Sequence, residues 1–445
     1  MSSPKECQFK LQASVLSHHG HWDAEVTIKI FAIATLDCFT GRRSTSNLNV
    51  LASRWACGTT TGVRGLRRSG SSLQLHSEIH REENVHVFVL DCGISVADAK
   101  DATHAYLAQA SNNTRKALRP LEVPPTLSSD NTLRGSECGA RVPRLKVCTV
   151  VYGQGGRLAQ GGYLEEWLGL LSSFGVTEVG IYVIDEVPST LWAELQRADD
   201  RLREGTHTRG STAMSVFKFI PMTRWGWDEQ HVGSSPASHS LALEHCFTVG
   251  AMAGVDWVTA IDTDELVRVR DPDDLTDRLP AQAIAASSAG VVPGLCRLLD
   301  LLRYDGWNGE QHIKLTGIRH SLKGERCRRR SNGSHALSAL QGMPCKDEWF
   351  EARRWARGHG PSRVFDGCCA DALYKGWKVI WRPTLPHFAS GVHGPGALST
   401  RFYFVPPEVG YVAHLDSSSP CDCHFVASGG VRDAVDTQES WLAFR

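Results

Sequence analysis

The feature that most constrains the fold is an alternation of apolar runs and amphipathic stretches between about Leu145 and Leu266. The segments "RLKVCTVVYG", "VTEVGIYVID", "VFKFIP" and "WVTAID" predict strands that are buried on both faces. Between them, "YLEEWLGLLSSFG", "PSTLWAELQRADDRLRE" and "SHSLALEHCFTVGAMAG" predict helices, with Gly175 as the C-cap of the first and Ser238 capping the third. This order predicts an α/β fold, with a mainly parallel sheet and helices on both faces.

Composition limits the function classes. The chain has 445 residues, with 48 Lys+Arg against 48 Asp+Glu. A nucleic-acid binder usually has a basic excess, so we expect no nucleic-acid partner. No run approaches the roughly 18 apolar residues of a membrane helix, and "MSSPKECQFK" lacks the order of a signal peptide. We therefore expect either a soluble protein or a chain whose true N-terminus differs from this one, with membrane association through an unseen anchor.

The 14 cysteines show no repeated CxxC pair at zinc spacing, so we expect no structural zinc. Disulfides would suit a protein of the secretory pathway. Two acceptor sequons for N-glycosylation, at Asn112 and Asn332, point in the same direction.

The chain divides unevenly. Residues 1–140 are hard to organise beyond a strand at Val85 to Leu90 and a Pro- and Ser-rich linker. Residues 141–425 form the predicted α/β domain, which includes later strands at Trp377 to Arg382 and in "VGYVAHLD". Residues 426–445 form a C-terminal tail.

The stretch "DWVTAIDTDELVRV" carries the main chemical signal. An apolar strand from Val258 to Ile261 ends in Asp262, Asp264 and Glu265. Carboxylates this close repel, so a positive charge should compensate them, and a cation is the obvious candidate. Residues i and i+2 of an extended segment project to one side, so both aspartates can offer oxygens to one Mg²⁺ or Mn²⁺. A solvated acidic turn is the alternative interpretation.

The acidic cluster also predicts a substrate. Mg²⁺-type ions take one or two protein carboxylates and fill their other positions with water and phosphate. A diphosphate-bearing substrate therefore fits, with the metal as Lewis acid for the leaving group. Glu265 faces away from Asp264 in the simplest geometry and would orient a ligand of the ion. Asp185 also ends a predicted strand, and we expect it to share a crevice with Asp262 on a neighbouring parallel strand.

Several segments together resemble one protein family. "WVTAIDTDELV" resembles the Trp-(Ile/Val)-x-x-(Ile/Leu)-Asp-x-Asp-Glu-(Phe/Leu) signature of glycosyltransferase family 92 and the related family-2-like glycosyltransferases. "GGYLEEWLGLLSSFGVTEVGIYVID", "HSLALEHCF", "KVIWRPTLPHFASGVHGP" and "VAHLDSSS" resemble other segments of that family, in the expected order. The resemblance covers about residues 144–419. The family's Trp-x-x-Phe-Gly-x-x-Gly block, which helps shape the acceptor side, is not evident after the acidic cluster.

The resemblance implies a GT-A-like fold, a UDP-sugar donor, a divalent metal and an inverting transfer, with galactose as one donor sugar. Carried over by position, Asp262 and Asp264 would hold metal and ribose-diphosphate, and Asp185 would lie near the nucleotide. Relatives are typically Golgi type II membrane proteins, so the resemblance also implies a secretory-pathway lumen.

Other residues have narrower roles in this hypothesis. His393 and His414 are candidate third metal ligands, or else structural histidines. Arg382 would contact phosphate or form a strand-end salt bridge, and Arg157 would reach the diphosphate from a Gly-rich loop. An inverting transfer needs a general base, for which the sequence offers four weak candidates: Asp347, Glu348, Asp366 and Asp371.

The sequence thus predicts a metal-dependent glycosyltransferase that moves a hexose from a UDP-sugar to a glycan hydroxyl, using Mn²⁺ or Mg²⁺. Two alternatives stay open. One is a non-catalytic nucleotide- or carbohydrate-binding module on the same fold. The other is a metal-dependent phosphohydrolase.

Overall fold

The fold was analysed in a computed structural model, which describes part of the 445-residue chain. The described residues are 9–17, 25–35, 55–60, 73–82, 85–109, 115–121, 143–151, 158, 163–183, 187–204, 213–218, 234–263, 265–269, 293–304, 306–309, 311–320, 373–383, 388–391, 394–396, 402–406 and 409–415. No helix within these ranges is long and apolar enough to cross a membrane.

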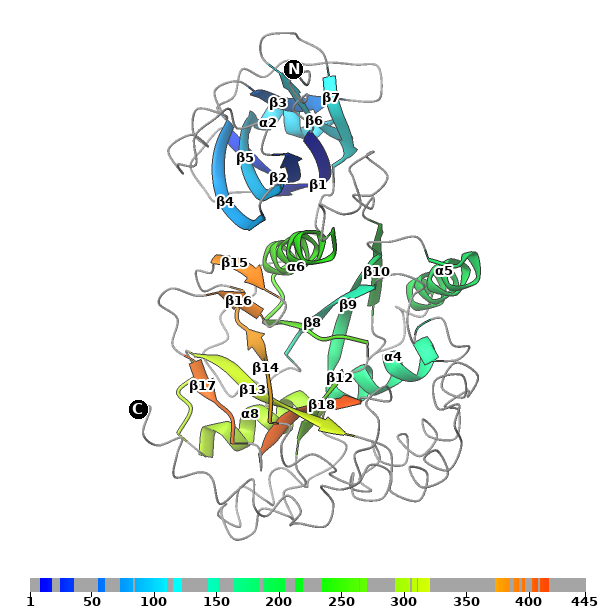
Figure 1. The fold of residues 1–445 in the computed structure, drawn as a ribbon, viewed down its shortest axis with the longest axis vertical. Helices are drawn as coiled ribbons and strands as arrows, with labels where there is room; N and C mark the ends of the chain where they lie inside the picture. The colour runs from blue at the N-terminus through cyan, green and yellow to red at the C-terminus, as the bar shows by residue number, and fades with distance from the viewer. Residues whose placement is uncertain are drawn as a thin grey trace, which may run out of the picture.

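A nine-stranded mixed sheet forms the centre of the larger part, in the order β10-β9-β8-β11-β14-β13-β18-β12, with β17 beside β13 (Figure 1). Its first four strands are mutually parallel, as the continuous apolar runs predicted. They are β8 (Leu145–Val151), β9 (Val176–Val183), β10 (Ala213–Lys218) and β11 (Trp257–Ala260).

The other half of this sheet is mixed rather than parallel. Strand β14 runs antiparallel to both β11 and β13, and β12 runs antiparallel to β18, whereas β13 is parallel to β17 and β18. These strands are β12 (Glu265–Val269), β13 (His312–His320), β14 (Leu373–Trp381), β17 (Phe402–Phe404) and β18 (Gly410–Leu415). The prediction of a mainly parallel sheet therefore holds for the first half only.

Helices cover both faces of the sheet, which confirms that part of the prediction. Helices α4 (Tyr163–Phe174), α5 (Ser189–Glu204) and α8 (Gly294–Tyr304) contribute to one apolar core, and α6 (Ser234–Met252) contributes to the other. Alternation along the strands separates the two cores, because Val147 faces the first and Cys148 faces the second.

The helix ends were predicted with mixed success. Helix α4 ends before Gly175, whose positive φ of 104° is the left-handed conformation of a C-cap, as expected. Helix α6 begins at Ser234, so the prediction that Ser238 caps it is wrong. Ser238 lies inside the helix and is buried, as is every residue from 238 to 250. A helix buried on all sides has no polar face to mark its start in the sequence.

The N-terminal region, which the sequence left unorganised, holds two antiparallel sheets. One has the order β1-β2-β5-β4, and its strand β5 extends the predicted strand at Val85 to Leu90 as far as Ser95. The other has the order β3-β6-β7. A disulfide between Cys57 of β3 and Cys92 of β5 joins the two sheets. The elements are β1 (Phe9–Ser17), β2 (Glu25–Thr35), β3 (Trp55–Thr60), β4 (Leu73–Glu82), β5 (Val85–Ser95), α2 (Val96–Lys100), β6 (His104–Gln109) and β7 (Arg115–Pro120).

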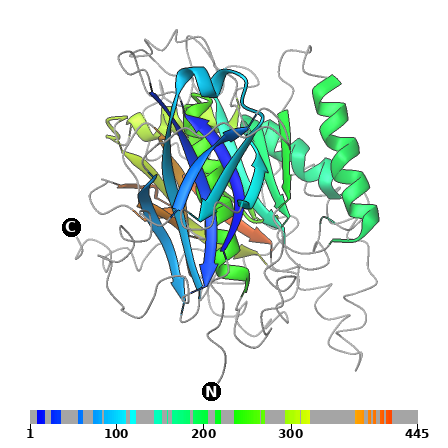
Figure 2. The same ribbon diagram turned by 90° about the horizontal axis from the view of Figure 1, so that it is seen from above.

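Helix α6 joins the two parts of the molecule. It lies between the N-terminal strands and the nine-stranded sheet in Figure 1, and Figure 2 shows the same strands from above, overlying that sheet. Phe31 and Val89 from the N-terminal sheet share one apolar core with Phe247 of α6. The ring of Phe31 meets His245 edge-on, with centroids 4.9 Å apart. A short hairpin of β15 (Phe388–Gly391) and β16 (Gly394–Gly396) completes the described elements.

Candidate functional site

Asp262 lies at a topological switch point of the sheet. The chain runs from β8 outward through β9 to β10, and then returns to pair β11 with the other side of β8. The backbone N–H of Ile261 still donates to Cys148 O of β8, at 3.0 Å, and Asp262 is the next residue. Ligands of open α/β sheets bind outside the carboxyl ends of the strands at such a point.

The acidic cluster forms the turn between β11 and β12, and residues 262–265 are called the acidic turn below. Glu265 is the first residue of β12, and its backbone N–H donates to Asp262 O at 3.0 Å. In return, the Asp262 N–H donates to the Glu265 carboxylate at Oε2, at 2.9 Å. These two hydrogen bonds close the turn on itself. Asp264 lies outside the described residues.

A lysine supplies the positive charge that the acidic cluster requires. Lys378 Nζ of β14 lies 2.9 Å from Asp262 Oδ2 and 2.8 Å from Glu265 Oε2. The side chains of Lys378 and Glu265 are each 4% exposed, whereas that of Asp262 is 37% exposed. The Glu265 carboxylate is therefore buried within the turn, whereas the Asp262 carboxylate reaches the protein surface.

The protonation of the trio follows from burial and charge. Burial disfavours the Lys378 ammonium, but attraction to Glu265 and Asp262 outweighs burial and raises the pKa of Lys378. Burial raises the pKa of the Glu265 carboxyl, and repulsion from Asp262 adds to this, while Lys378 opposes both. Lys378 is therefore firmly cationic, and its charge opposes the rise in the pKa of the Glu265 carboxyl.

One carboxylate oxygen of the turn suits a ligand. Lys378 contacts Asp262 through Oδ2, and Oδ1 of the same carboxylate has no partner within the described ranges. A carboxylate that is 37% exposed at a strand end fits the contact that we predicted for Asp262 with a hydrated metal ion or a ribose. In the part of the chain that the structure describes, no group of three His, Cys, Asp or Glu side chains could hold a metal. Asp264 and His393 are not in that part.

Strand β8 separates the two strands that we predicted to be neighbours. Strand β9, which precedes Asp185, and strand β11, which precedes Asp262, each pair with β8 and not with one another. The prediction of adjacent strands is thus wrong, because the chain adds β9 and β10 on one side of β8 and β11 on the other. Both strands still run parallel in one sheet, and Asp185 itself lies outside the described residues.

Arg382, for which we predicted either a phosphate contact or a strand-end salt bridge, does not join the acidic turn. Strand β14 is antiparallel to β11, with Trp381 opposite Val258, so Arg382 lies at the start of β11 and Asp262 follows its end. The Arg382 guanidinium stacks 4.4 Å from the ring centroid of Trp257. Its backbone N–H donates to His312 Nδ1 at 3.3 Å. Arg382 thus packs against aromatic rings at the opposite end of the sheet.

The remaining predicted residues are placed only in part. His414 of β18 is the cross-strand partner of Glu265, so the backbone brings the candidate ligand to the acidic turn. Its side chain is outside what the structure describes. The same holds for the whole of six other predicted residues: Arg157, Asp347, Glu348, Asp366, Asp371 and His393.

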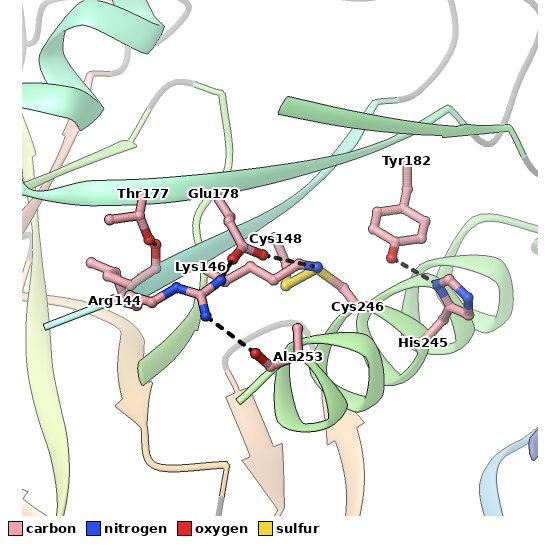
Figure 3. Close-up of polar contacts among 10 residues, drawn as sticks. Arg144, Lys146, Cys148, Thr177, Glu178, Tyr182, His245, Cys246 and Ala253 are labelled. Atoms are coloured by element: carbon pink, nitrogen blue, oxygen red, sulfur yellow. Dashed lines mark hydrogen bonds and ion pairs between the residues drawn. A yellow bond between two sulfur atoms is a disulfide. The ribbon is translucent and has the colours of Figure 1, made fainter. Parts of the chain in front are cut away.

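A second polar cluster occupies the opposite ends of the parallel strands (Figure 3). Arg144 Nη2 pairs with Glu178 Oε1, and Arg144 Nη1 donates to Ala253 O at 3.2 Å. Buried Lys146 lies 3.8 Å from Glu178 Oε2. These contacts tie the start of β8 to the start of β9 and to the end of α6. They lie at the strand ends where such sheets do not bind ligands, so we assign them a structural role.

Figure 3 also shows two links between α6 and the sheet. A disulfide joins Cys148 of β8 to Cys246 of α6, and Tyr182 Oη lies 2.8 Å from His245 Nδ1. Sequence analysis missed these contacts, and it missed Lys378 as a site residue. The signal for Lys378 was present, since a lysine inside the apolar run "WKVIW" must find a buried anion.

The described site is thus a half-exposed carboxylate at a switch point, fixed by a buried lysine and a buried glutamate. Such a carboxylate can accept hydrogen bonds from a polar ligand or coordinate a hard cation. Lys378 holds that carboxylate in place through its Oδ2 atom. No protein-family model matches the chain, and no curated protein matches it significantly in sequence.

Proposed function

We propose that this protein is a metal-dependent glycosyltransferase of GT-A-like architecture. It moves a hexose, with galactose as the first candidate, from a UDP-sugar to a glycan hydroxyl with inversion. The observation that carries the proposal is the position of Asp262, which follows β11 at the switch point and is fixed by Lys378. The family resemblance of the acidic turn and of four further segments supports the same function.

Each residue of the turn has a separate task in this proposal. Asp264 and Asp262 hold Mn²⁺ or Mg²⁺, with His414 or His393 as a further ligand, and the ion stabilises charge on the departing diphosphate. Lys378 fixes the Asp262 carboxylate through Oδ2, which leaves Oδ1 for the ion or the ribose. Glu265 fixes the backbone of Asp262 through the hydrogen bond to its N–H. Asp185 and Arg157 approach the nucleotide and the diphosphate.

The acceptor hydroxyl must lose its proton during the transfer. A carboxylate within hydrogen-bond reach of that hydroxyl is the simplest general base. The candidates remain Asp347, Glu348, Asp366 and Asp371.

We also propose that the protein folds in the lumen of the secretory pathway, as Golgi glycosyltransferases do. Its cysteines support this localisation, because Cys57 pairs with Cys92, Cys148 pairs with Cys246, and Cys296 is disulfide-bonded as well. Stable disulfides are typical of oxidising compartments and rare in the cytosol. A protein that is cytosolic in cells, with its thiols reduced, would contradict this localisation.

The decisive experiment measures UDP binding by calorimetry, with and without Mn²⁺. In the parent protein, Mn²⁺ should increase the affinity for UDP. Asp264→Asn preserves size and removes one charge, so it should weaken Mn²⁺-dependent binding at least tenfold, or about 1.4 kcal/mol. Asp200→Asn, at an exposed position of α5, is the matched control and should bind as the parent does. Equal binding by parent and Asp264→Asn would refute the donor site.

A turnover assay then separates the proposal from its alternatives. A glycosyltransferase releases UDP from a UDP-hexose fast only when an acceptor glycan is added. A phosphohydrolase would cleave the diphosphate without acceptor, and a non-catalytic module would release nothing under either condition.

A further inference from the structure

A lysine surrounded by aromatic rings lies on strand β13, next to β14, the strand that carries Lys378. Lys314 Nζ is 3.7 Å from the ring centroid of Trp377, 4.7 Å from that of Phe404 and 5.6 Å from that of Phe402. We call these four residues the aromatic–lysine patch. Trp377 is 45% exposed and Phe404 is 63% exposed, so two of the rings reach solvent.

The sheet register explains why these side chains gather. Strand β13 lies between β14 and β17, with Lys314 directly opposite Phe404 and Thr316 opposite Trp377. Side chains two residues apart on a strand share a face, so all four residues of the patch project from the same face. Phe402 also packs against the apolar core beneath α6. The patch is thus the solvent-exposed continuation of that core.

Lys314 carries a charge that no acid balances within the described ranges. The three rings surround its ammonium group there, and burial alone lowers the pKa of that group. Lys378 shows the opposite behaviour one strand away, where two carboxylates hold the charge. An anionic ligand at Lys314 would provide the charge partner that the described residues do not.

The patch is level with the acidic turn. Val258 pairs with Trp381 and Thr259 with Ile380, so each step forward on β11 is a step back on β14. Continued two residues past the end of β11, this register brings Asp262 level with Trp377. Trp377 precedes Lys378 on β14, so its side chain projects to the opposite face from Lys378, whose Nζ contacts Asp262. A glycan that extends from Asp262 past the end of β11 would therefore reach the patch on the other face of the sheet.

Resting on the proposed glycosyltransferase function, we propose that the aromatic–lysine patch binds an anionic sugar unit, carboxylated or sulfated, of the acceptor glycan. The exposed rings offer flat apolar surfaces to the C–H face of a pyranose ring. Lys314 offers a charged donor to its carboxylate or sulfate. Two exposed rings around one cation match a single sugar unit. A stable protein interface uses about 20–30 residues on each side, whereas the patch consists of four.

Calorimetry with three hexasaccharides tests the proposal. Hyaluronan hexasaccharide carries carboxylates only, chondroitin sulfate hexasaccharide adds sulfates, and chitohexaose is neutral. We expect at least one anionic glycan to bind about tenfold more tightly than chitohexaose, with an affinity that falls as salt is added. The stronger of the two anionic glycans identifies the charged group. Equal binding of all three, or binding of none, would overturn the proposal.

Variants locate the binding surface. Phe404→Ala, Trp377→Ala and Lys314→Met should each weaken binding of the anionic glycan about tenfold, since each removes a stacking surface or the charged donor. Lys314→Met should also abolish the salt dependence. Tyr304→Ala removes another exposed ring, 49% exposed, and Lys100→Met removes an exposed charge on α2, so both serve as controls that bind as the parent does. Parent-like glycan binding by all three patch variants would overturn the proposal.

UDP binding in Mn²⁺, measured on the same variants, separates this inference from the proposed function. It should stay at the parent level in Phe404→Ala, because that residue touches only the acceptor. Parent protein that binds UDP with Mn²⁺ but no anionic glycan would overturn the inference and leave the transferase intact. Parent protein that binds the glycan but no UDP would overturn the transferase, and with it the assignment of the patch as an acceptor site.

Discussion

Lys378 and Glu265 form an ion pair in the interior of the protein, with Nζ 2.8 Å from Oε2 and each side chain 4% exposed. Removing two charges from water costs several kcal/mol, which good geometry and further hydrogen bonds must offset. Here Asp262 supplies both: its carboxylate also accepts from Lys378, and its N–H donates to Glu265. The pair therefore fixes the shape of the acidic turn, whatever its net contribution to stability.

Loss of the lysine should be costly. Lys378→Met fills similar space but leaves the Glu265 carboxylate buried without a cation, for which we expect a loss of about 3–5 kcal/mol in the free energy of unfolding. Denaturant titration measures this loss. Lys100→Met, which removes an exposed lysine, should change stability by about 0.5 kcal/mol or less. Similar losses in both variants would show that the buried pair has no special role.

Low pH should partly rescue Lys378→Met. In this variant the two largest remaining causes, burial and repulsion from Asp262, raise the pKa of Glu265, and only the hydrogen bond from the Asp262 N–H still lowers it, since the cation has gone. A carboxyl whose folded pKa lies above its unfolded value of 4.5 favours folding more as pH falls through the folded pKa. The stability gap between parent and variant should therefore shrink from pH 8 towards pH 5. A gap that is constant, or wider at pH 5, would contradict this account.

Neutralising the two carboxylates that contact Lys378 should reduce the stability of the protein by different amounts. Glu265→Gln removes the buried charge partner of Lys378, and we expect it to lose about 3 kcal/mol or more. Asp262→Asn acts at a side chain that is 37% exposed, and Glu265 remains beside the lysine, so about 1 kcal/mol is expected. For donor binding the order should reverse, because in the proposed function Asp262 contacts the metal or the ribose, whereas Glu265 is buried. Thermal unfolding and UDP calorimetry on the same two variants provide both comparisons.

The parallel half of the fold could be predicted because its signals are local. Each of its strands is a continuous apolar run, and Gly175 marks the end of α4. The acidic turn could be located from the sequence, but the lysine that neutralises it could not be identified. Lys378 lies 116 residues after Asp262, and nothing in the sequence shows which of the distant lysines reaches it.

Two features of the sheet could not be predicted, for a topological reason. The sequence contains no mark of strand direction, so it could not show that antiparallel β14 carries Arg382 to the end of the sheet opposite Asp262. The sequence does not show the order of the strands either, and β8 lies between the strands that precede Asp185 and Asp262. Family resemblance preserves the order of segments along the chain, which does not by itself reveal their order in the sheet.

The disulfide between Cys148 and Cys246 should contribute substantially to stability. It links residues 98 positions apart and joins α6 to β8. Closing a loop of that length restricts the unfolded chain, and removal of such a bond typically costs about 2–5 kcal/mol. We expect the double variant Cys148→Ala/Cys246→Ala to unfold at lower denaturant than the parent. Peptide mapping by mass spectrometry without reductant should find these two cysteines in one linked fragment, and two separate free-thiol peptides would contradict the pairing.

Two glycines at α4 should respond to alanine in opposite directions. Gly175 has a φ of 104°, which an L-residue adopts only with strain, and a Cβ there would lie 3.0 Å from Pro293 Cβ. Gly175→Ala should therefore cost about 1–2 kcal/mol. Gly169 is exposed within the helix, and a Cβ there would meet nothing within 4 Å. Gly169→Ala should instead stabilise by about 0.5–1 kcal/mol, because alanine has less freedom to lose in a helix.

Both variants keep the same composition and change the same helix, so general effects of the substitution cancel in the comparison. Urea titration of the pair with the parent measures the two shifts. Destabilisation by Gly169→Ala, or none by Gly175→Ala, would contradict a helix that runs through residue 169 and ends at a left-handed glycine at 175.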